Sequence, residues 1–394
     1  MHHSIMLIPR KLSSKLISSS KLFPIVTLTG PRQSGKTTLV KACFPDYTYC
    51  NLENPEIRTM TNNDPKTFFH IYKTPIIIDE VQRVPELLSW IQVLSDENPK
   101  HGQYILTGSN QLQLNETISQ SLAGRTAVFN LPPLSISEIQ EYCPERQQKE
   151  TMIVNGFLPR FYNDEIPANL IYSNYFSTYI ERDVRLLANI KNLTQFENFI
   201  RLLAGRIGQI VNLSSLSNDV GISSTTLANW LSILEASYII YRLPPYHSNM
   251  EKRITKSPKL YFVETGLANW LLGIETPEQC IRNPLFGNIF ENMVVMDIVK
   301  QRVNKGYDPR LFLYRDAKGH EVDLFFDQQR VPYPIEIKSA MTWNEQFSKG
   351  ITWFQSANKT SNKGAVVYSG DIEFDRETYV VRNYHSDILT QFEK

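Results

Sequence analysis

The first third of the chain alternates short apolar runs with stretches of helical periodicity. The run Pro-Ile-Ile-Ile-Asp at residues 75–79 shows no polar–apolar alternation, which is typical of strands buried on both faces of a parallel sheet. Further β-prone runs lie at residues 24–29, 48–52, 103–107 and 127–131, with helices expected within the first 24 residues, from residue 36 and around residues 86–94. Strands that alternate with helices at this spacing predict a right-handed α/β sheet.

The pattern changes after the pair Pro132-Pro133. The next stretch is mostly helical, and it is followed by a helix–turn–helix rhythm that ends in a β-prone segment able to form a wing. From about residue 281 the pattern predicts one helix, then strands, then a helix and a strand. We therefore expect an α/β domain at residues 1–134, a helical lid or linker at 135–205, a winged-helix-like unit at 206–280 and a second α/β unit at 281–394.

A glycine-containing loop follows the first predicted strand. Residues 30–37, Gly-Pro-Arg-Gln-Ser-Gly-Lys-Thr, fit the pattern G-x-x-x-x-G-K-[ST] between a strand and a helix. The glycines let successive backbone N–H groups face a phosphate chain at a helix N-terminus. Lys36 would reach the β- and γ-phosphates of ATP, and Thr37 would ligate Mg²⁺. The residues predicted to bind the nucleotide are Gly30, Pro31, Arg32, Gln33, Ser34, Gly35, Lys36, Thr37 and Thr38.

An acidic pair ends the strand at residues 75–79 and supplies the second half of this site. Asp79 would hold Mg²⁺, directly or through water, and Glu80 would polarise the attacking water. In isolation such a pair can be merely solvated. Beside a phosphate-binding loop, a second acid next to the metal-binding one favours hydrolysis over nucleotide holding.

Two further residues are catalytic candidates. Asn110, or its neighbour Ser109, follows the fourth predicted strand and could orient water, although Gly-Ser-Asn is also an ordinary turn. Arg125 could act as an arginine finger, in cis or from a neighbouring subunit, although an arginine at a strand edge is more often in a salt bridge. A trans arginine would require a homo-oligomer.

These motifs occur in an order that resembles a known family. The segments Gly-Pro-Arg-Gln-Ser-Gly-Lys-Thr-Thr, Ile-Ile-Ile-Asp-Glu-Val-Gln, Leu-Thr-Gly-Ser-Asn and Ser-Leu-Ala-Gly-Arg, with the later Tyr-Phe-Ser-Thr-Tyr-Ile-Glu-Arg-Asp-Val, are similar to those of AAA-type prokaryotic ATPases whose C-terminal half is a domain of unknown function. The resemblance covers essentially the whole chain. It implies a P-loop AAA+ ATPase core, an accessory winged-helix region and a nuclease-like tail.

Four residues of the last unit form a second constellation. Glu291 lies on an apolar predicted helix, Asp323 on a strand, and Glu336 and Lys338 on the next strand, where positions i and i+2 share a face. The order resembles the PD-(D/E)XK core of restriction endonucleases, in which carboxylates around Mg²⁺ activate water for attack on a phosphodiester. An inert nuclease-like scaffold and a solvated strand pair are the alternatives.

The charge balance bears on the partner of this protein. Lys and Arg number 41 against 40 Asp and Glu, a net charge of +1, which excludes a uniformly basic protein but not a local basic patch. The predicted wing gathers Arg242, Lys252, Arg253, Lys256 and Lys259, and the helix before it begins with four hydroxyl residues, Ser223, Ser224, Thr225 and Thr226. With Asn229, which could read a base edge, they make DNA the expected partner. Protein contacts and ordinary helix caps are the alternatives.

The remaining composition narrows the setting. Four cysteines without metal-type spacing indicate reduced thiols, and no apolar run approaches the roughly 18 residues of a membrane span. We therefore expect a cytoplasmic protein without a membrane partner. The function predicted from sequence is an ATP hydrolase that drives remodelling of DNA or movement along it. The alternatives are an ATP-gated, metal-dependent DNA nuclease and a nucleotide-switched signalling or assembly ATPase.

Overall fold

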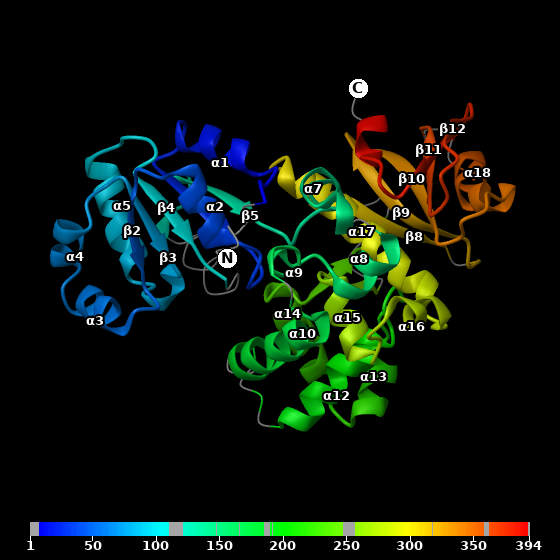
Figure 1. Cartoon of the computed structure of the whole chain (residues 1–394), viewed down its shortest axis with the longest axis horizontal. Coiled ribbons are helices and arrows are strands. Elements are labelled where there is room, and N and C mark those ends of the chain that lie inside the picture. The colour runs from blue at the N-terminus through cyan, green and yellow to red at the C-terminus, as the bar shows by residue number, and fades with distance from the viewer. Residues whose placement is uncertain are drawn as a thin grey trace.

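The computed structural model describes residues 8–109, 121–146, 148–164, 166–184, 190, 192–246, 257–316, 318–357 and 362–392. Figure 1 shows two sheets at opposite sides of the molecule, the N-terminal one in blue and cyan and the C-terminal one in orange and red, with helices in green and yellow between and below them.

The N-terminal sheet is parallel and has the strand order β2-β3-β4-β1-β5. Its strands are β1 (Ile25–Thr29), β2 (Thr48–Asn51), β3 (Ile76–Asp79), β4 (Tyr104–Thr107) and β5 (Thr126–Asn130). The prediction of a parallel α/β sheet is confirmed, and β1, β3 and β4 are buried along their whole length. The order places β4 between β1 and β3, so the three strand ends that carry the predicted chemistry are neighbours.

Helices cover both faces of this sheet. They are α1 (Ser13–Ser20), α2 (Lys36–Cys43), α3 (Pro55–Asn63), α4 (Pro65–Ile71) and α5 (Leu87–Glu97). Successive residues of β3 enter different clusters: Ile77 packs with α1 and α2, whereas Ile76 and Ile78 pack with α4 and α5. The helix expected over the first 24 residues is shorter in the structure, where α1 begins at Ser13 and ends at Ser20.

The middle of the chain is helical, as predicted. Its helices are α7 (Ile136–Tyr142), α8 (Lys149–Asn155), α9 (Pro159–Asn163), α10 (Ala168–Tyr175), the π-helix η3 (Phe176–Val184), α12 (Leu193–Ala204), α13 (Leu213–Val220), α14 (Ser224–Ala236), α15 (Thr265–Leu271) and α16 (Pro277–Arg282). Asn212 caps α13 and Ser223 caps α14, and Gly221 ends α13 in the left-handed region, where glycine is favoured. The antiparallel pair β6 (Ile240–Leu243) and β7 (Lys259–Phe262) follows. The assignment of these elements to a winged helix stays a prediction.

The C-terminal unit is β-rich. The long helix α17 (Phe286–Asn304) precedes β8 (Leu311–Arg315), β9 (Glu321–Gln328), β10 (Val331–Lys338), α18 (Lys349–Ala357), β11 (Gly364–Tyr368), β12 (Phe374–Asp375) and β13 (Tyr379–Asn383). The mixed sheet has the order β12-β13-β11-β10-β9-β8, with β9 and β10 antiparallel and β10 and β11 parallel. Short 3₁₀ turns are η1 (Val81–Arg83), η2 (Pro144–Arg146), η5 (Glu345–Ser348) and η6 (Ile388–Gln391).

One apolar core runs through the middle and C-terminal units. It takes side chains from α7 to α15, from α17 and from the inner face of the C-terminal sheet, so these elements are packed as one body. In the part of the chain that the structure describes, no helix combines the length and the apolarity needed to cross a membrane.

Candidate functional site

The loop after β1 is shaped by its two glycines. Gly30 has φ +143°, and a Cβ atom there would lie 2.4 Å from the carbonyl oxygen of Leu131, so the loop passes the residue after β5 at a distance that only glycine allows. Gly35 has φ +91° and caps α2, which begins at Lys36. The predicted strand–loop–helix context is therefore present, with the N-terminus of α2 facing the space where a phosphate would bind.

Lys36 lies folded against this loop. Its Nζ donates to the carbonyl oxygens of Gly30 at 2.9 Å and Pro31 at 2.8 Å. Burial lowers the pKa of Lys36 to about 8, against the opposing charges of Glu80 and Asp79. A bound phosphate would supply the anionic partner that the backbone carbonyls only partly replace.

The carboxylate of Asp79 is held at the end of β3. Its Oδ2 accepts from Thr37 Oγ1 at 2.8 Å and from Tyr49 OH at 2.8 Å, and its other oxygen accepts from Thr107. The contact between Thr37 and Asp79 fits the two protein ligands expected of a Mg²⁺ site beside phosphates. Tyr49 was not predicted from sequence. Thr107 ends β4, the strand whose polar end was expected near the phosphates if it lay between β1 and β3, and the sheet order places it there.

Among the described residues, no three His, Cys, Asp or Glu side chains are grouped closely enough to hold an ion by themselves. Mg²⁺ at Thr37 and Asp79 would therefore share its coordination with the nucleotide, which is its usual mode at phosphate sites.

Glu80 lies in the same pocket on a strained turn. Its backbone has φ +56°, and its carboxylate accepts from Gln82 and, at 3.1 Å, from Ser109 Oγ. Of the two residues that could help to orient water, Ser109 is thus in reach of Glu80. Asn110 lies outside the described residues.

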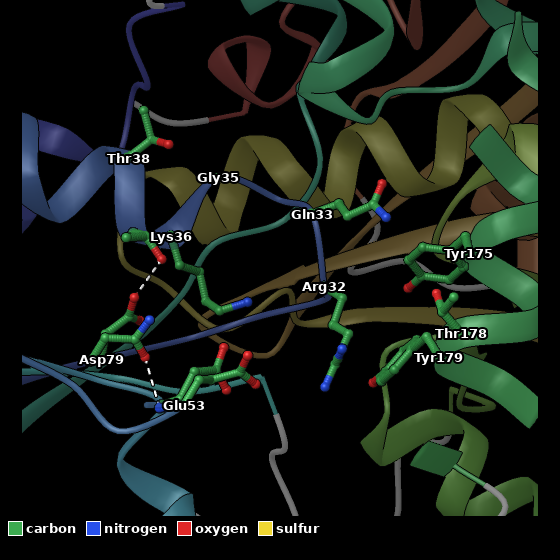
Figure 2. Close-up of a pocket in the computed structure, with 13 residues that line it drawn as sticks. Arg32, Gln33, Gly35, Lys36, Thr38, Glu53, Asp79, Tyr175, Thr178 and Tyr179 are labelled. Atoms are coloured by element: carbon green, nitrogen blue, oxygen red, sulfur yellow. Dashed lines mark hydrogen bonds between the residues drawn. The ribbon is translucent and has the colours of Figure 1, made fainter. Parts of the chain in front are cut away.

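The pocket itself has a volume of about 350 Å³. The N-terminal domain supplies most of its lining, namely Arg32, Gln33, Gly35, Lys36, Thr37, Thr38, Asn51, Glu53, Asp79 and Glu80. Tyr175, Thr178 and Tyr179 of the middle region close it on the other side, as Figure 2 shows. Sequence reasoning missed these three residues, and their only signal was the family-like segment around Tyr179.

Arg125 does not reach this pocket. Its guanidinium forms two hydrogen bonds with the carboxylate of Asp96 at 2.6 and 2.8 Å, and it is not among the residues that line the pocket. The expectation of a cis arginine finger at Arg125 is therefore wrong for this structure, and the salt bridge at a strand edge was the better interpretation. A role in trans stays a prediction.

The predicted C-terminal constellation is brought together by α17, β9 and β10. Lys338 Nζ donates to Asp323 Oδ2 at 2.9 Å and to Glu336 Oε2 at 2.5 Å. Burial and the Asp323 carboxylate raise the pKa of Glu336, against the opposing charge of Lys338. Burial and Asp323 also raise the pKa of Glu291, to about 6. The structure therefore brings Glu291, Asp323, Glu336 and Lys338 together. However, the Lys338 ammonium lies between the Asp323 and Glu336 carboxylates, which were expected to share an ion.

Lys259 joins the same cluster and was misassigned from sequence. It is 4% exposed, and its Nζ pairs with Glu291 at 2.8 Å and with Glu321 at 3.1 Å. Tyr261, two residues along β7, donates to the same Glu291 oxygen at 2.5 Å. Lys259 is therefore not part of a DNA-facing wing; it is an internal cation of the carboxylate cluster.

The rest of the predicted basic wing is only partly described. Arg242 pairs with Glu235 and is thus partly neutralised, whereas Lys252, Arg253 and Lys256 lie outside the described residues. At the start of α14, by contrast, the capping residue Ser223 and Thr225, Thr226 and Asn229 of the helix are exposed, and Ser224 is half-buried.

Three family models match successive parts of the chain. Residues 22–140 match a model described as an AAA domain, and the phosphate-binding loop, Asp79 and Glu80 all lie inside that segment. The N-terminal part of this chain is thus similar in sequence to AAA domains. Residues 146–278 and 286–385 match two domains of unknown function, DUF8612 and DUF4143. The likeness to AAA-type ATPases with a C-terminal domain of unknown function is confirmed; the nuclease-like character of that domain stays a prediction.

Several relatives and solved structures match the chain to differing extents. A protein of Mycobacterium tuberculosis described as uncharacterized is 29% identical over 393 residues, which cover 98% of this chain and 86% of the relative. Another, of Haemophilus influenzae, is 24% identical over 311 residues, 70% of this chain and 74% of that protein. The Walker-type ATPase of Pyrococcus abyssi aligns with a TM-score of 0.44 and 15% identity, over 66% of this chain and 95% of that one. AMPPCP-bound DnaA from Aquifex aeolicus aligns with a TM-score of 0.30 and 14% identity, over 57% and 86%.

Proposed function

We propose that this chain is a Mg²⁺-dependent ATP hydrolase. The observation that carries the proposal is the 2.8 Å contact of Thr37 with Asp79 in a pocket that also contains Lys36 and Glu80. A phosphate-binding loop, a metal-binding pair and a separate carboxylate are the parts that phosphoryl transfer to water requires.

Each residue has a distinct task in this proposal. The loop N–H groups and Lys36 bind the β- and γ-phosphates, and the Thr37 hydroxyl and Asp79 hold Mg²⁺, which neutralises charge on the phosphate oxygens when bound. Glu80 accepts a hydrogen bond from the attacking water and orients it. Ser109 and Gln82 hold the Glu80 carboxylate toward the pocket.

Two substitutions test this assignment. Lys36→Ala removes the cation that binds the phosphates, so the variant should lose ATP binding and turnover together. Glu80→Gln keeps the shape but removes the base, so ATP should still bind while kcat falls by about 10²–10⁴-fold. ATP affinity and phosphate release are measured separately. The matched control is Glu97→Gln, the same substitution at an exposed glutamate at the end of α5. Undiminished turnover in Lys36→Ala contradicts the proposal.

The work that hydrolysis drives is, in our proposal, remodelling of DNA or movement along it. The support is the exposed start of α14, where hydroxyls able to contact phosphates and Asn229 share one helix. We expect DNA to stimulate turnover and Asn229→Ala with Thr225→Ala to weaken that stimulation without changing basal turnover. Turnover measured on single-stranded, duplex and branched DNA decides the matter. A rate that none of these changes favours the signalling or assembly ATPase instead.

Metal-dependent cleavage of DNA is a second candidate, favoured by the assembly of Glu291, Asp323, Glu336 and Lys338 from three elements. A shared ion at Asp323 and Glu336 would have to displace the Lys338 ammonium from both carboxylates. If the cluster cleaves, supercoiled plasmid is nicked in Mg²⁺ or Mn²⁺, and Asp323→Asn abolishes nicking while ATP turnover is retained. Nicking that survives Asp323→Asn, or none by the wild-type chain, leaves the cluster as a structural ion network.

A further inference from the structure

A second cation besides Lys36 faces the nucleotide pocket. Arg32 is the third residue of the phosphate-binding loop, and Figure 2 shows its side chain directed into the space between Glu53 and Tyr179. It is half-buried, and its charge is near enough to contribute to the lowering of the Lys36 pKa, after burial of Lys36 itself. Two cations therefore converge where an anionic phosphate chain would bind.

Tyr179 of η3 holds the guanidinium from the opposite wall. The Arg32 guanidinium carbon lies 5.2 Å from the centre of the Tyr179 ring, within the range of a cation–π contact. The ring is fixed in turn, because it is 4% exposed, packs edge-on against Tyr175 at 5.3 Å and donates its hydroxyl to the Ser237 carbonyl at 2.9 Å. The next residue, Tyr238, donates to Thr29 Oγ1 at 2.9 Å, directly before the loop. The turn at residues 237–238, which fixes Tyr179, is thus bonded to the end of β1, and the loop that carries Arg32 follows directly.

We propose that Arg32 is a catalytic residue of the ATP hydrolysis proposed above, and that Tyr179 is its positioning residue. In that reaction the water oxygen bonds to the γ-phosphorus, and the bond from that phosphorus to the β–γ bridging oxygen breaks. Glu80 orients the water and accepts the proton that it loses, and ADP and inorganic phosphate leave. Arg32 contacts the γ-phosphoryl oxygens and neutralises the charge on them and on the leaving oxygen. A guanidinium suits this role because it stays protonated and offers several donors in one plane.

The arrangement removes the need for an arginine from another subunit. Arg125, the candidate arginine finger from sequence, is bound to Asp96, whereas Arg32 belongs to the loop that holds the nucleotide. Because Tyr179 lies in the middle region, the position of the arginine depends on how that region meets the AAA domain. Hydrolysis is then sensitive to movement of the middle region without any change in the phosphate-binding loop.

The test separates chemistry from binding in the full chain. We compare Arg32→Ala, Arg32→Lys and Lys36→Ala with wild type in ATP affinity, in kcat and in binding of ADP with aluminium fluoride, which mimics the transferred phosphoryl group. Loss of a catalytic arginine should lower kcat by about 10³-fold. We expect both Arg32 variants to bind ATP nearly normally, to lose turnover and to lose the aluminium fluoride complex. Lys36→Ala should lose all three, and Arg206→Ala, which removes an exposed ion pair with Asp219, should lose none.

The outcomes are distinguishable. Wild-type turnover that persists in Arg32→Ala, or ATP binding lost there as in Lys36→Ala, overturns the catalytic role and leaves the proposed ATPase intact. A wild-type chain without turnover overturns the ATPase and this inference with it. Tyr179→Ala should lower kcat at unchanged ATP affinity, and Tyr179→Phe should restore it because the ring remains. Equal turnover in all three Tyr179 forms overturns the positioning role.

Discussion

Lys259 shows how a single residue can be misjudged from sequence. Lysine is almost never fully buried unless it is paired, so a lysine at the edge of a basic segment is normally assigned to the surface. Here its partners, Glu291 and Glu321, come from α17 and β9, tens of residues further along the chain. The nearby carboxylates raise the pKa of Lys259 although burial acts to lower it. Only the packing of β7 against the C-terminal unit reveals that pairing.

This pairing predicts a measurable loss of stability. Lys259→Met should destabilise the protein by about 3–5 kcal/mol, because it leaves the Glu291 carboxylate buried without its cation. The double variant Lys259→Met with Glu291→Gln should recover most of that loss, since the remaining group is neutral. Urea unfolding of the three forms measures the coupling between the two sites. Lys363→Met, at an exposed pair with Asp375, is the control and should cost no more than about 1 kcal/mol.

Additive effects of the two substitutions would contradict the pairing. In that case the carboxylate is solvated when Lys259 is removed, and Lys259 is held at the cluster by packing of its methylene chain alone.

At the scale of elements, the sequence pattern predicted those helices, strands and loops whose formation depends on neighbouring residues. Buried parallel strands, the glycine loop and the capped helices α13 and α14 each depend on residues within a few positions of one another, and all three predictions are confirmed. The meeting of Thr37, Asp79 and Glu80 followed from the rule that parallel strands end at one edge of a sheet.

Contacts between distant elements could not be predicted in the same way. Tyr179 closes the nucleotide pocket from a π-helix about 140 positions after the loop, and no periodicity links the two segments. Arg125 illustrates the same limit, because only the fold shows that it pairs with Asp96 and does not line the pocket. Arg32, by contrast, was predicted to bind the nucleotide from its place in the loop, but its contact with Tyr179 was not. Sequence therefore predicted the candidate nucleotide-binding residues of the N-terminal α/β domain, but not the pocket wall that the middle region provides.

At the scale of the whole molecule, one buried cation joins the phosphate-binding loop to the following units. Arg10 is 7% exposed, and its guanidinium donates to the Ser34 carbonyl at 2.8 Å, to the Pro132 carbonyl at 2.7 Å and to Glu138 at 3.1 Å. Glu138, on α7, also accepts from the backbone N–H groups of Lys11 and Ser135, each at 2.8 Å. Arg10 therefore ties the loop to the segment that leaves β5.

The same segment is held from the other side by α17. Asp297 accepts from the Ile136 N–H at 2.7 Å, and Lys300 donates to the Leu134 carbonyl at 2.9 Å. Since α17 also carries Glu291, a continuous set of polar contacts and one helix connect the nucleotide loop with the C-terminal cluster. These contacts couple the nucleotide loop to the C-terminal cluster energetically only if both sites change how the contacts are arranged. Substitution at Arg10 can test this coupling.

Removal of Arg10 should produce a pH-dependent defect. Burial acts to raise the pKa of Glu138, but the charge of Arg10, the backbone N–H groups of Ser135 and Lys11 and the Arg10 hydrogen bond together outweigh it and lower that pKa below its ordinary value. In wild type this pair contributes stability above the unfolded pKa of the carboxyl, and the contribution is lost as pH falls through the folded pKa. In Arg10→Met the folded pKa of Glu138 rises instead, so the variant is penalised near neutral pH and the penalty fades on acidification.

The stability difference between wild type and Arg10→Met should therefore be large at pH 7.5, on the order of 3–5 kcal/mol, and smaller at pH 5. Urea unfolding at the two pH values measures it, and Arg10→Met with Glu138→Gln should show a much weaker pH dependence because no carboxyl remains to titrate. If ATP turnover in that double variant equals the wild-type rate, Arg10 only joins the units and does not set the shape of the loop. If turnover falls while stability is restored, the Arg10 contact with Ser34 shapes the phosphate-binding loop. In that case the C-terminal units affect the rate of hydrolysis through α17 and α7. A stability difference that is constant across pH would show that Glu138 stays charged and solvated without its partner, and the coupling argued from this buried pair would fail.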